Sequence, residues 1–150
     1  MYSPLSLSRT GRTPSIEGRL NVEMKLEVIK VAVSDVDRAR DFYAEKLGFN
    51  LDLDREVPGG IRIVQLTPEG SGCSLQLVTE GKPQEGLTLV VSDVVATHAE
   101  LSKLGAPLGD VIHYEDGKEV PGYSDEPWSS MVFFADPDGN KWIIQERPAS

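Results

Sequence analysis

The chain carries few of the side chains that most often perform covalent or metal chemistry. In 150 residues it has two histidines, His98 and His113, and one cysteine, Cys73. His113 stands two positions before Glu115, a spacing that puts both side chains on one face of a strand as an acid–base pair or as two metal donors. Cys73 begins a predicted strand and has no obvious base, so we expect a small buried hydrophobe there. His98 falls on the apolar stripe of a predicted helix, where we expect it to pack.

A second group of residues is suited to binding. Tyr123 and Trp128 lie in or beside a segment rich in Gly, Pro and acids, where a large apolar side chain has little core to join. We expect these two to line a pocket or a dimer contact, and Phe133 and Phe134 to pack in the core. The acids around them are Asp116, Glu119, Asp125 and Glu126. Aromatic rings beside carboxylates can attract a cationic ligand.

Composition excludes several classes of protein. The formal net charge is −9 with a pI of about 4.7, which argues against nucleic-acid binding because that needs a basic face. Hydrophobic residues make up 39% and charged residues 26%, an ordinary globular balance. We find no apolar run of membrane-spanning length, so we expect no membrane partner. A single cysteine cannot form a disulfide within the chain, which favours a cytoplasmic location.

The first 23 residues differ from the rest. Residues 1–23 are rich in Ser, Thr, Gly and Pro and show no hydrophobic period, which predicts a disordered leader. Within them, residues 16–19 read Ile-Glu-Gly-Arg, which resembles a protease-cleavage linker of an expression tag; an organellar transit peptide is the alternative. We expect residues 24–150 to form a single domain.

The rest of the chain repeats itself. Val33-Ser34-Asp35-Val36 recurs as Val91-Ser92-Asp93-Val94, and Lys46-Leu47-Gly48 recurs as Lys103-Leu104-Gly105 at nearly the same offset. Each copy reads as an apolar strand, a helix that starts at Ser-Asp and ends at Gly, and three further strands. The copies span residues 24–80 and 86–147, which indicates one duplicated supersecondary unit.

Each unit has the order βαβββ and buries one face of its sheet under its helix. Two units side by side therefore predict an α+β fold with a curved, cup-like mixed sheet and the helices outside. Residues 136–140, Asp-Pro-Asp-Gly-Asn, predict a tight turn between the last two strands. We treat the acidic stretch over residues 116–127 as a polar loop. Alternate strand residues would face the cup, where a ligand can bind.

Three segments together resemble those of a known family: the repeated Val-Ser-Asp-Val, the segment from Asp41-Phe42-Tyr43 to Leu47-Gly48-Phe49, and Phe134-Ala135-Asp136-Pro137-Asp138-Gly139-Asn140. The family that they resemble is the vicinal-oxygen-chelate superfamily of glyoxalases, extradiol dioxygenases and bleomycin-resistance proteins. The resemblance covers residues 24–147. It implies paired βαβββ modules and a homodimer with cups near the interface. It does not fix the function, because this fold hosts many chemistries.

The resemblance also assigns four metal-ligand positions, which fall on Val28, Gln76, Gly86 and Ile143. Only Gln76 has a side-chain donor, so we predict no metal and no cofactor. If Gln76 and Ile143 face the cup, alternation puts Gln145 there as well. We therefore predict ligand contacts, with catalytic residues unassigned, at six positions: Val28, Gln76, Ile143, Gln145, Tyr123 and Trp128.

Alternation also places other residues relative to the cup. Ser74, Val78 and Lys141 should share the face of Gln76 and Ile143, and at most one of Arg62 and Gln65 can face it.

Three hypotheses follow for the function. The first is a metal-free, dimeric protein that binds a small organic ligand in the cup, with sequestration of a cationic drug as one version. The second is a glyoxalase-like lyase or isomerase, or an extradiol-type dioxygenase, that uses an unrecognised metal site or the His113 and Glu115 pair. The third is a subunit that works through protein contacts alone.

Overall fold

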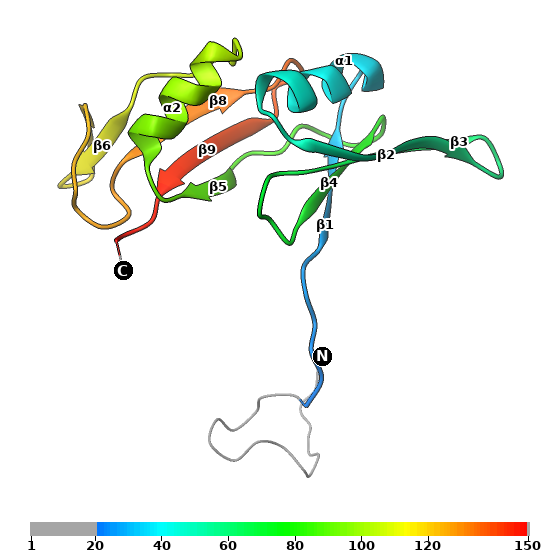
Figure 1. The fold of residues 1–150 in the computed structure, drawn as a ribbon, viewed down its shortest axis with the longest axis horizontal. Helices are drawn as coiled ribbons and strands as arrows, with labels where there is room; N and C mark the ends of the chain where they lie inside the picture. Colours follow the sequence, from blue (N-terminus) through cyan, green and yellow to red (C-terminus); the bar gives the residue numbers. More distant parts are fainter. Residues whose placement is uncertain (1–20, 150) are drawn as a thin grey trace.

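The computed structural model describes residues 21–149, in which two modules follow one another along the chain (Figure 1). The helices are α1 (Val36–Asp41), the π-helix η1 (Phe42–Lys46) and α2 (Val94–Lys103). The strands are β1 (Val28–Ala32), β2 (Asn50–Val57), β3 (Ile61–Thr67), β4 (Ser74–Val78), β5 (Leu87–Val91), β6 (Ile112–Glu115), β7 (Lys118–Pro121), β8 (Met131–Ala135) and β9 (Lys141–Glu146). Of the predicted leader, residues 1–20 lie outside the described part of the chain.

Two mixed sheets carry the predicted α+β architecture. The first sheet has the strand order β1-β4-β3-β2 and the second has the order β5-β9-β8-β6-β7. In each, the strand before the helix pairs in parallel with the last strand of its module, β1 with β4 and β5 with β9. The other pairings are antiparallel. None of the described helices is long and apolar enough to span a membrane.

The repeated Ser-Asp segments begin the helices as predicted. The side chain of Asp35 accepts a hydrogen bond from the amide of Arg38, and that of Asp93 accepts one from the amide of Ala96. These bonds satisfy first-turn amides that have no partner within the helix. In the first module the helix continues as η1, whose wider turn begins with the buried residues Phe42 and Tyr43.

The core lies between the helices and one face of each sheet. Alternation directs Val31, Leu75 and Leu77 of the first sheet and Trp142 and Ile144 of the second into it, and all five are buried. The aromatic rings of both modules meet there, because Tyr43 and Phe49 contact Trp142 at centroid distances of 5.7 and 6.1 Å. The two modules therefore share one hydrophobic core.

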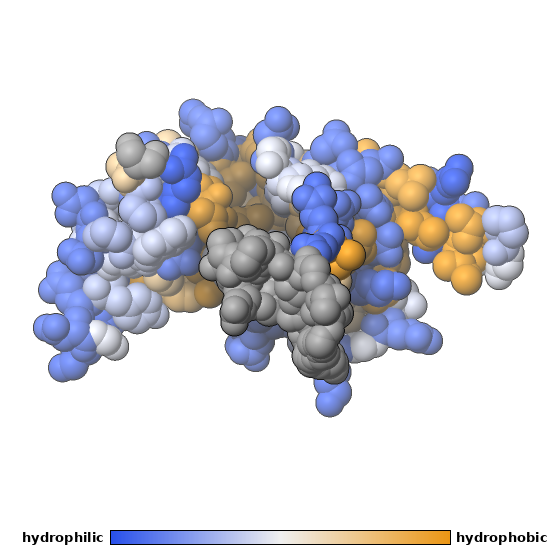
Figure 2. Space-filling view, turned by 90° about the horizontal axis from the view of Figure 1, so that it is seen from below, coloured by the Kyte–Doolittle hydropathy of each residue, from blue (hydrophilic) through white to orange (hydrophobic). Residues whose placement is uncertain are grey.

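The opposite face of each sheet, which we call the open face, is turned away from the helices. Figure 2 views the molecule from that side and shows hydrophobic residues along the protruding β2–β3 hairpin, where Ile61 is largely exposed. On the second sheet the open face carries Phe133, because Phe133 pairs with Ile143 and alternates with the buried Phe134. The prediction that Phe133 packs in the core is therefore wrong, whereas that for Phe134 is confirmed.

The predicted polar loop over residues 116–127 contains a strand. Lys118–Pro121 forms β7 and pairs with β6 across the turn at Asp116 and Gly117. Both turn residues have positive φ, 52° and 77°, as a two-residue hairpin turn of type I′ requires. The remainder of the segment, from Gly122 onward, returns to β8 and carries the aromatic residues considered below.

Candidate functional site

The four positions that the resemblance assigns to metal ligands do not form a metal site. Val28 and Gln76 lie on the open face of the first sheet and Ile143 on that of the second, while Gly86 precedes β5. Only the Gln76 amide can donate an electron pair from its side chain, so these residues do not fit a divalent ion. Across residues 21–149, no three His, Cys, Asp or Glu side chains are grouped so that they could hold a metal.

The open face of the first sheet instead carries a hydrogen-bonded polar chain. Gln76 Nε2 donates to Gln65 Oε1 at 3.0 Å, and Gln65 Nε2 donates to Asp52 Oδ2 at 3.5 Å. Asp52 also accepts from the hydroxyl of Thr67, and this bond lowers the pKa of its carboxyl group more than any other contact. Arg62 lies on the other face, where it binds Asp54 and Asp37. Gln65 is therefore the one of the pair that faces the cup side.

The residues predicted to form an aromatic pocket do come together at one end of the second sheet. Tyr123 and Trp128, 47% and 48% exposed, line a pocket of about 400 Å³ with the start of α2 and the end of β9. We call it the aromatic pocket. Gln145 is not part of the lining, but from the open face its Nε2 donates to the carbonyl oxygen of Trp128 at 2.7 Å. Of the predicted site residues, only Tyr123 and Trp128 line this pocket, whereas Gln145 and Ile143 lie on the open face of the second sheet.

Trp128 is held in an unusual backbone conformation. Its φ is 64°, in the left-handed region that large side chains rarely adopt. Two hydrogen bonds fix this turn, one from Gln145 to the Trp128 carbonyl and one from the amide of Ser129 to the carbonyl of Glu126 at 3.1 Å. The turn presents the indole ring at the pocket instead of in the core.

Sequence reasoning missed the residue that organises the floor of this pocket, Glu146. Its Oε1 accepts from the Tyr123 hydroxyl at 2.6 Å, and its Oε2 accepts from the amide of Val94 in the first turn of α2 at 3.0 Å. The bond to Glu146, with the nearby charges of Asp125 and Asp93, raises the pKa of the Tyr123 phenol. The phenol therefore stays protonated and keeps donating to Glu146.

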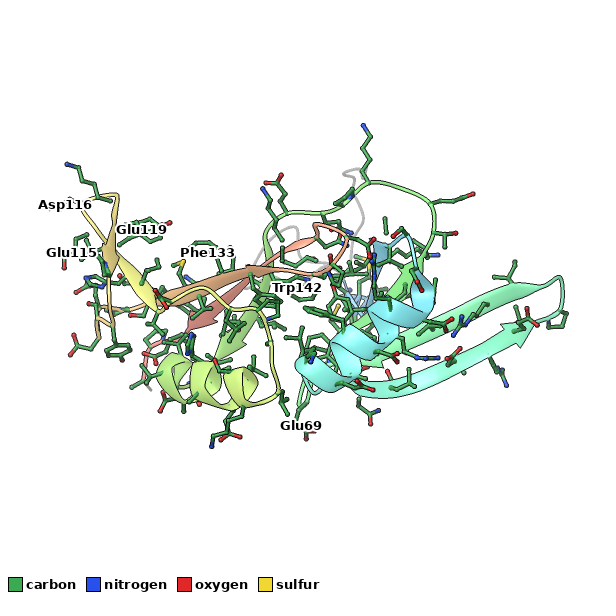
Figure 3. All side chains as sticks on the ribbon, turned by 90° about the horizontal axis from the view of Figure 1, so that it is seen from above. Glu69, Glu115, Asp116, Glu119, Phe133 and Trp142 are labelled. Carbon is green, nitrogen blue, oxygen red and sulfur yellow. The ribbon has the colours of Figure 1, made fainter. Side chains whose placement is uncertain are left out.

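The aromatic pocket is strongly acidic. Its lining has four carboxylates and one cation: Asp93, Asp125, Glu126, Glu146 and Arg147. No cationic side chain within residues 21–149 pairs with any of the four carboxylates. Figure 3 shows Asp116 and Glu119, the other two predicted acids, farther out on the β6–β7 hairpin, and neither lines the pocket.

The predicted pair of His113 and Glu115 forms, but its geometry is structural. His113 Nε2 lies 2.7 Å from Glu115 Oε2, and Nδ1 lies 2.7 Å from the carbonyl oxygen of Gly122. Both partners are acceptors, so this geometry favours the doubly protonated ring, in which each nitrogen donates. The Gly122 carbonyl and then Glu115 raise the pKa of His113. The ring is buried and has no free nitrogen to offer to a substrate.

Comparisons with known proteins agree with the fold. A family model described as Glyoxalase/Bleomycin resistance protein/Dioxygenase superfamily matches residues 25–144. The crystal structure of TnmS3, an antibiotic binding protein from Streptomyces sp. CB03234, is 30% identical with a TM-score of 0.66, and the match covers 86% of this chain and 99% of that one.

Two further proteins match over a similar length. A glyoxalase/bleomycin resistance protein from the same Streptomyces strain is 32% identical with a TM-score of 0.61, covering 81% of this chain and 99% of that one. The uncharacterized protein YetH of Bacillus subtilis (strain 168) is 23% identical over 81% of this chain and 98% of its own length.

Proposed function

The chain belongs to the Glyoxalase/Bleomycin resistance protein/Dioxygenase superfamily, and on that premise we propose that it binds a small organic cation in the aromatic pocket and sequesters it without chemical change. The observation that carries the proposal is the combination of half-exposed Trp128 and Tyr123 with the carboxylates around them. An aromatic face attracts a cation through its quadrupole, and carboxylates that have no cationic partner also attract it by Coulomb forces. A cationic drug is the ligand class that this lining favours.

Three further observations support binding over catalysis. The four positions of the superfamily's metal ligands hold one donor side chain among them, and such a set does not fit a divalent metal ion. Both ring nitrogens of the buried His113 are already hydrogen-bonded, to the Gly122 carbonyl and to Glu115. TnmS3, which is similar over 86% of this chain, is an antibiotic binding protein.

The pocket size suits a drug fragment or a small polycyclic cation. A volume of about 400 Å³ falls within the range of small-molecule sites. We further propose a cytoplasmic location, because a reducing compartment suits a chain with one cysteine.

A titration with two probes of matched shape tests the proposal. We expect 1-methylquinolinium, a flat aromatic cation, to bind and to quench tryptophan fluorescence, and its neutral isostere 1-methylnaphthalene to bind much more weakly. Because Trp142 is buried, the quenching should come from Trp128 and should vanish in Trp128→Leu. Tyr114→Leu is the control, because Tyr114 is a partly exposed aromatic residue outside the pocket. Equal affinity for both probes would rule out recognition of the charge, and unchanged quenching in Trp128→Leu would rule out this pocket.

A further inference from the structure

The carboxylates that line the aromatic pocket fall into two sets, those that already accept hydrogen bonds and those that do not. Asp93 and Glu146 belong to the first set. Asp93 accepts from the amide of Ala96 at 2.9 Å, and Glu146 accepts from the Val94 amide and the Tyr123 hydroxyl. These two carboxylates therefore hold the start of α2 and the Tyr123 ring in place.

The second set lies in the loop that carries the aromatic rings. Asp125 and Glu126 line the pocket and stand between Tyr123 and Trp128 in the sequence. Within residues 21–149, neither carboxylate accepts a hydrogen bond or pairs with a cation. The half-exposed Trp128 offers an aromatic face beside them. This side of the pocket therefore suits the positive end of a ligand.

Where β9 ends beside α2, the pocket carries a cation. Arg147 follows β9 directly, and its amide donates to the carbonyl oxygen of Val91 at 2.9 Å. This bond holds Arg147 next to Ser92, and both residues line the pocket. In the described part of the chain, the Arg147 guanidinium forms no ion pair or hydrogen bond, and the Ser92 hydroxyl has no partner. Guanidinium and hydroxyl groups are donors that bind a carboxylate well.

Arg147 makes the pocket selective for more than positive charge. A ligand that is only cationic is repelled by this guanidinium, whereas a ligand that also carries a carboxylate gives the guanidinium a partner of opposite charge. The cost of one charge in the lining thus becomes a contact.

We propose that the ligand of the aromatic pocket is a zwitterion that carries an aromatic cation and a carboxylate. The cation lies against Trp128, beside Asp125 and Glu126. The carboxylate binds Arg147 and the hydroxyl of Ser92. This inference rests on the cation site proposed above and narrows its ligand class.

The experiment compares quinolinium probes that carry a carboxylate with amides of the same shape. The acids are 1-(carboxymethyl)quinolinium and 1-(3-carboxypropyl)quinolinium, which place the carboxylate at two distances from the ring, and the controls are their primary amides. Quenching of Trp128 fluorescence at about pH 7.5, where the carboxylates are ionised, gives each dissociation constant. We expect at least one acid to bind roughly threefold to tenfold more tightly than its amide. The net negative charge of the lining alone predicts the reverse order, because the amides are net cations.

Variants of the full chain assign the effect to Arg147. Arg147→Gln should remove the preference for the acid and bind 1-methylquinolinium about twofold to threefold more tightly, because a like charge leaves the lining. Arg147→Lys should keep part of the preference, since lysine keeps the charge but not the planar pair of donors. Lys118→Gln removes a positive charge from β7 outside the pocket and should bind every probe as the parent does.

The outcomes separate this inference from the proposed function, and unfolding midpoints check that every variant folds. If 1-methylquinolinium binds but neither acid binds more tightly than its amide, the ligand is a simple cation and the zwitterion inference is wrong. If the preference for an acid survives in Arg147→Gln, another group binds the carboxylate and the role of Arg147 is wrong. If neither 1-methylquinolinium nor any acid quenches Trp128, the cation site itself fails, and this inference fails with it.

Discussion

The hydroxyl of Tyr43 in the first module donates a 2.6 Å hydrogen bond to Oδ2 of Asp136 in the second, and both residues are buried. Asp136 is fully satisfied, because Oδ1 accepts from the amides of Asp138 and Asn140 and Oδ2 also accepts from Asn140 Nδ2. The Tyr43 oxygen in turn accepts from Trp142 Nε1 at 3.0 Å. Burial and then the bond to Asp136 raise the pKa of Tyr43. This relay joins the two modules through polar groups inside a shared apolar core.

Tyr43→Phe should destabilise the protein by about 2 kcal/mol, because it deprives a buried carboxylate of a donor and leaves the Trp142 N–H without an acceptor. Urea unfolding followed by fluorescence measures the loss. Tyr114→Phe is the control, because its ring is partly exposed and its hydroxyl has no hydrogen-bond partner in the described residues. A loss below about 0.5 kcal/mol in Tyr43→Phe would mean that water replaces the hydroxyl.

Local signals in the sequence predicted much of the fold. The Ser-Asp caps, the glycines that end the helices and the turn at residues 136–140 depend on near neighbours in the chain, and the structure bears them out. Asp35 and Asp93 cap their helices, and Gly48, Gly105 and Gly139 have positive φ. Each of these features follows from backbone rules that act over four or five residues.

Features that depend on cross-strand pairing were harder to predict. Phe133 faces away from the core because it pairs with Ile143, and that register is set across two strands. Asp52 joins the polar chain of the first sheet at a β-bulge between Leu51 and Leu53, which changes the side-chain alternation locally. Strand β7, by contrast, had a signal in the Asp116-Gly117 pair that favours a hairpin. The pocket residue Glu146 gave no local signal at all, since its partners Tyr123 and Val94 are distant in the chain.

Stability should fall as the pH rises through the titration of His113. The pKa of His113 in the folded chain is raised above its ordinary value of 6.5 by the Gly122 carbonyl and Glu115. Its contribution is therefore complete below about pH 6.5 and is lost as the pH rises through the folded pKa. Urea unfolding from about pH 5.5 to 9 should show the advantage of the parent over His113→Gln shrinking across this range.

Two variants in the β6–β7 hairpin test whether the bond between Glu115 and His113 causes this pH dependence. Glu115→Gln should weaken it, because the carboxylate that accepts from Nε2 is gone. Glu119→Gln removes a charge from the same hairpin but no hydrogen bond of the His113 ring, so the pH dependence of stability should stay unchanged. An NMR titration of His113 with a midpoint at or below 6.5 would contradict the prediction.

The acids of the aromatic pocket should strengthen the binding of a cationic ligand. Asp125→Asn/Glu126→Gln removes two carboxylates from the lining, whereas Asp116→Asn/Glu119→Gln removes two from the adjoining hairpin outside it. At low ionic strength the first variant should bind 1-methylquinolinium roughly threefold to tenfold more weakly, and the second should bind it as the parent does. The difference should shrink in about 0.5 M NaCl, where exposed charges are screened. If both variants lost the same affinity for 1-methylquinolinium, the attraction would come from the overall negative charge of the protein and not from the acids of the pocket.

Trp128 should lower the stability of the protein through its backbone conformation while its indole ring contributes to ligand binding. Its φ of 64° costs a large L residue roughly 1 kcal/mol, whereas glycine adopts the conformation without that cost. Trp128→Gly should therefore be more stable than Trp128→Leu by about 1 kcal/mol in urea unfolding, because leucine keeps the strain and glycine relieves it. Both variants should lose 1-methylquinolinium binding, because neither supplies an aromatic face to the pocket. If leucine proved as stable as glycine at this position, the backbone would not be strained, and the exposed tryptophan would need no functional reason to be there.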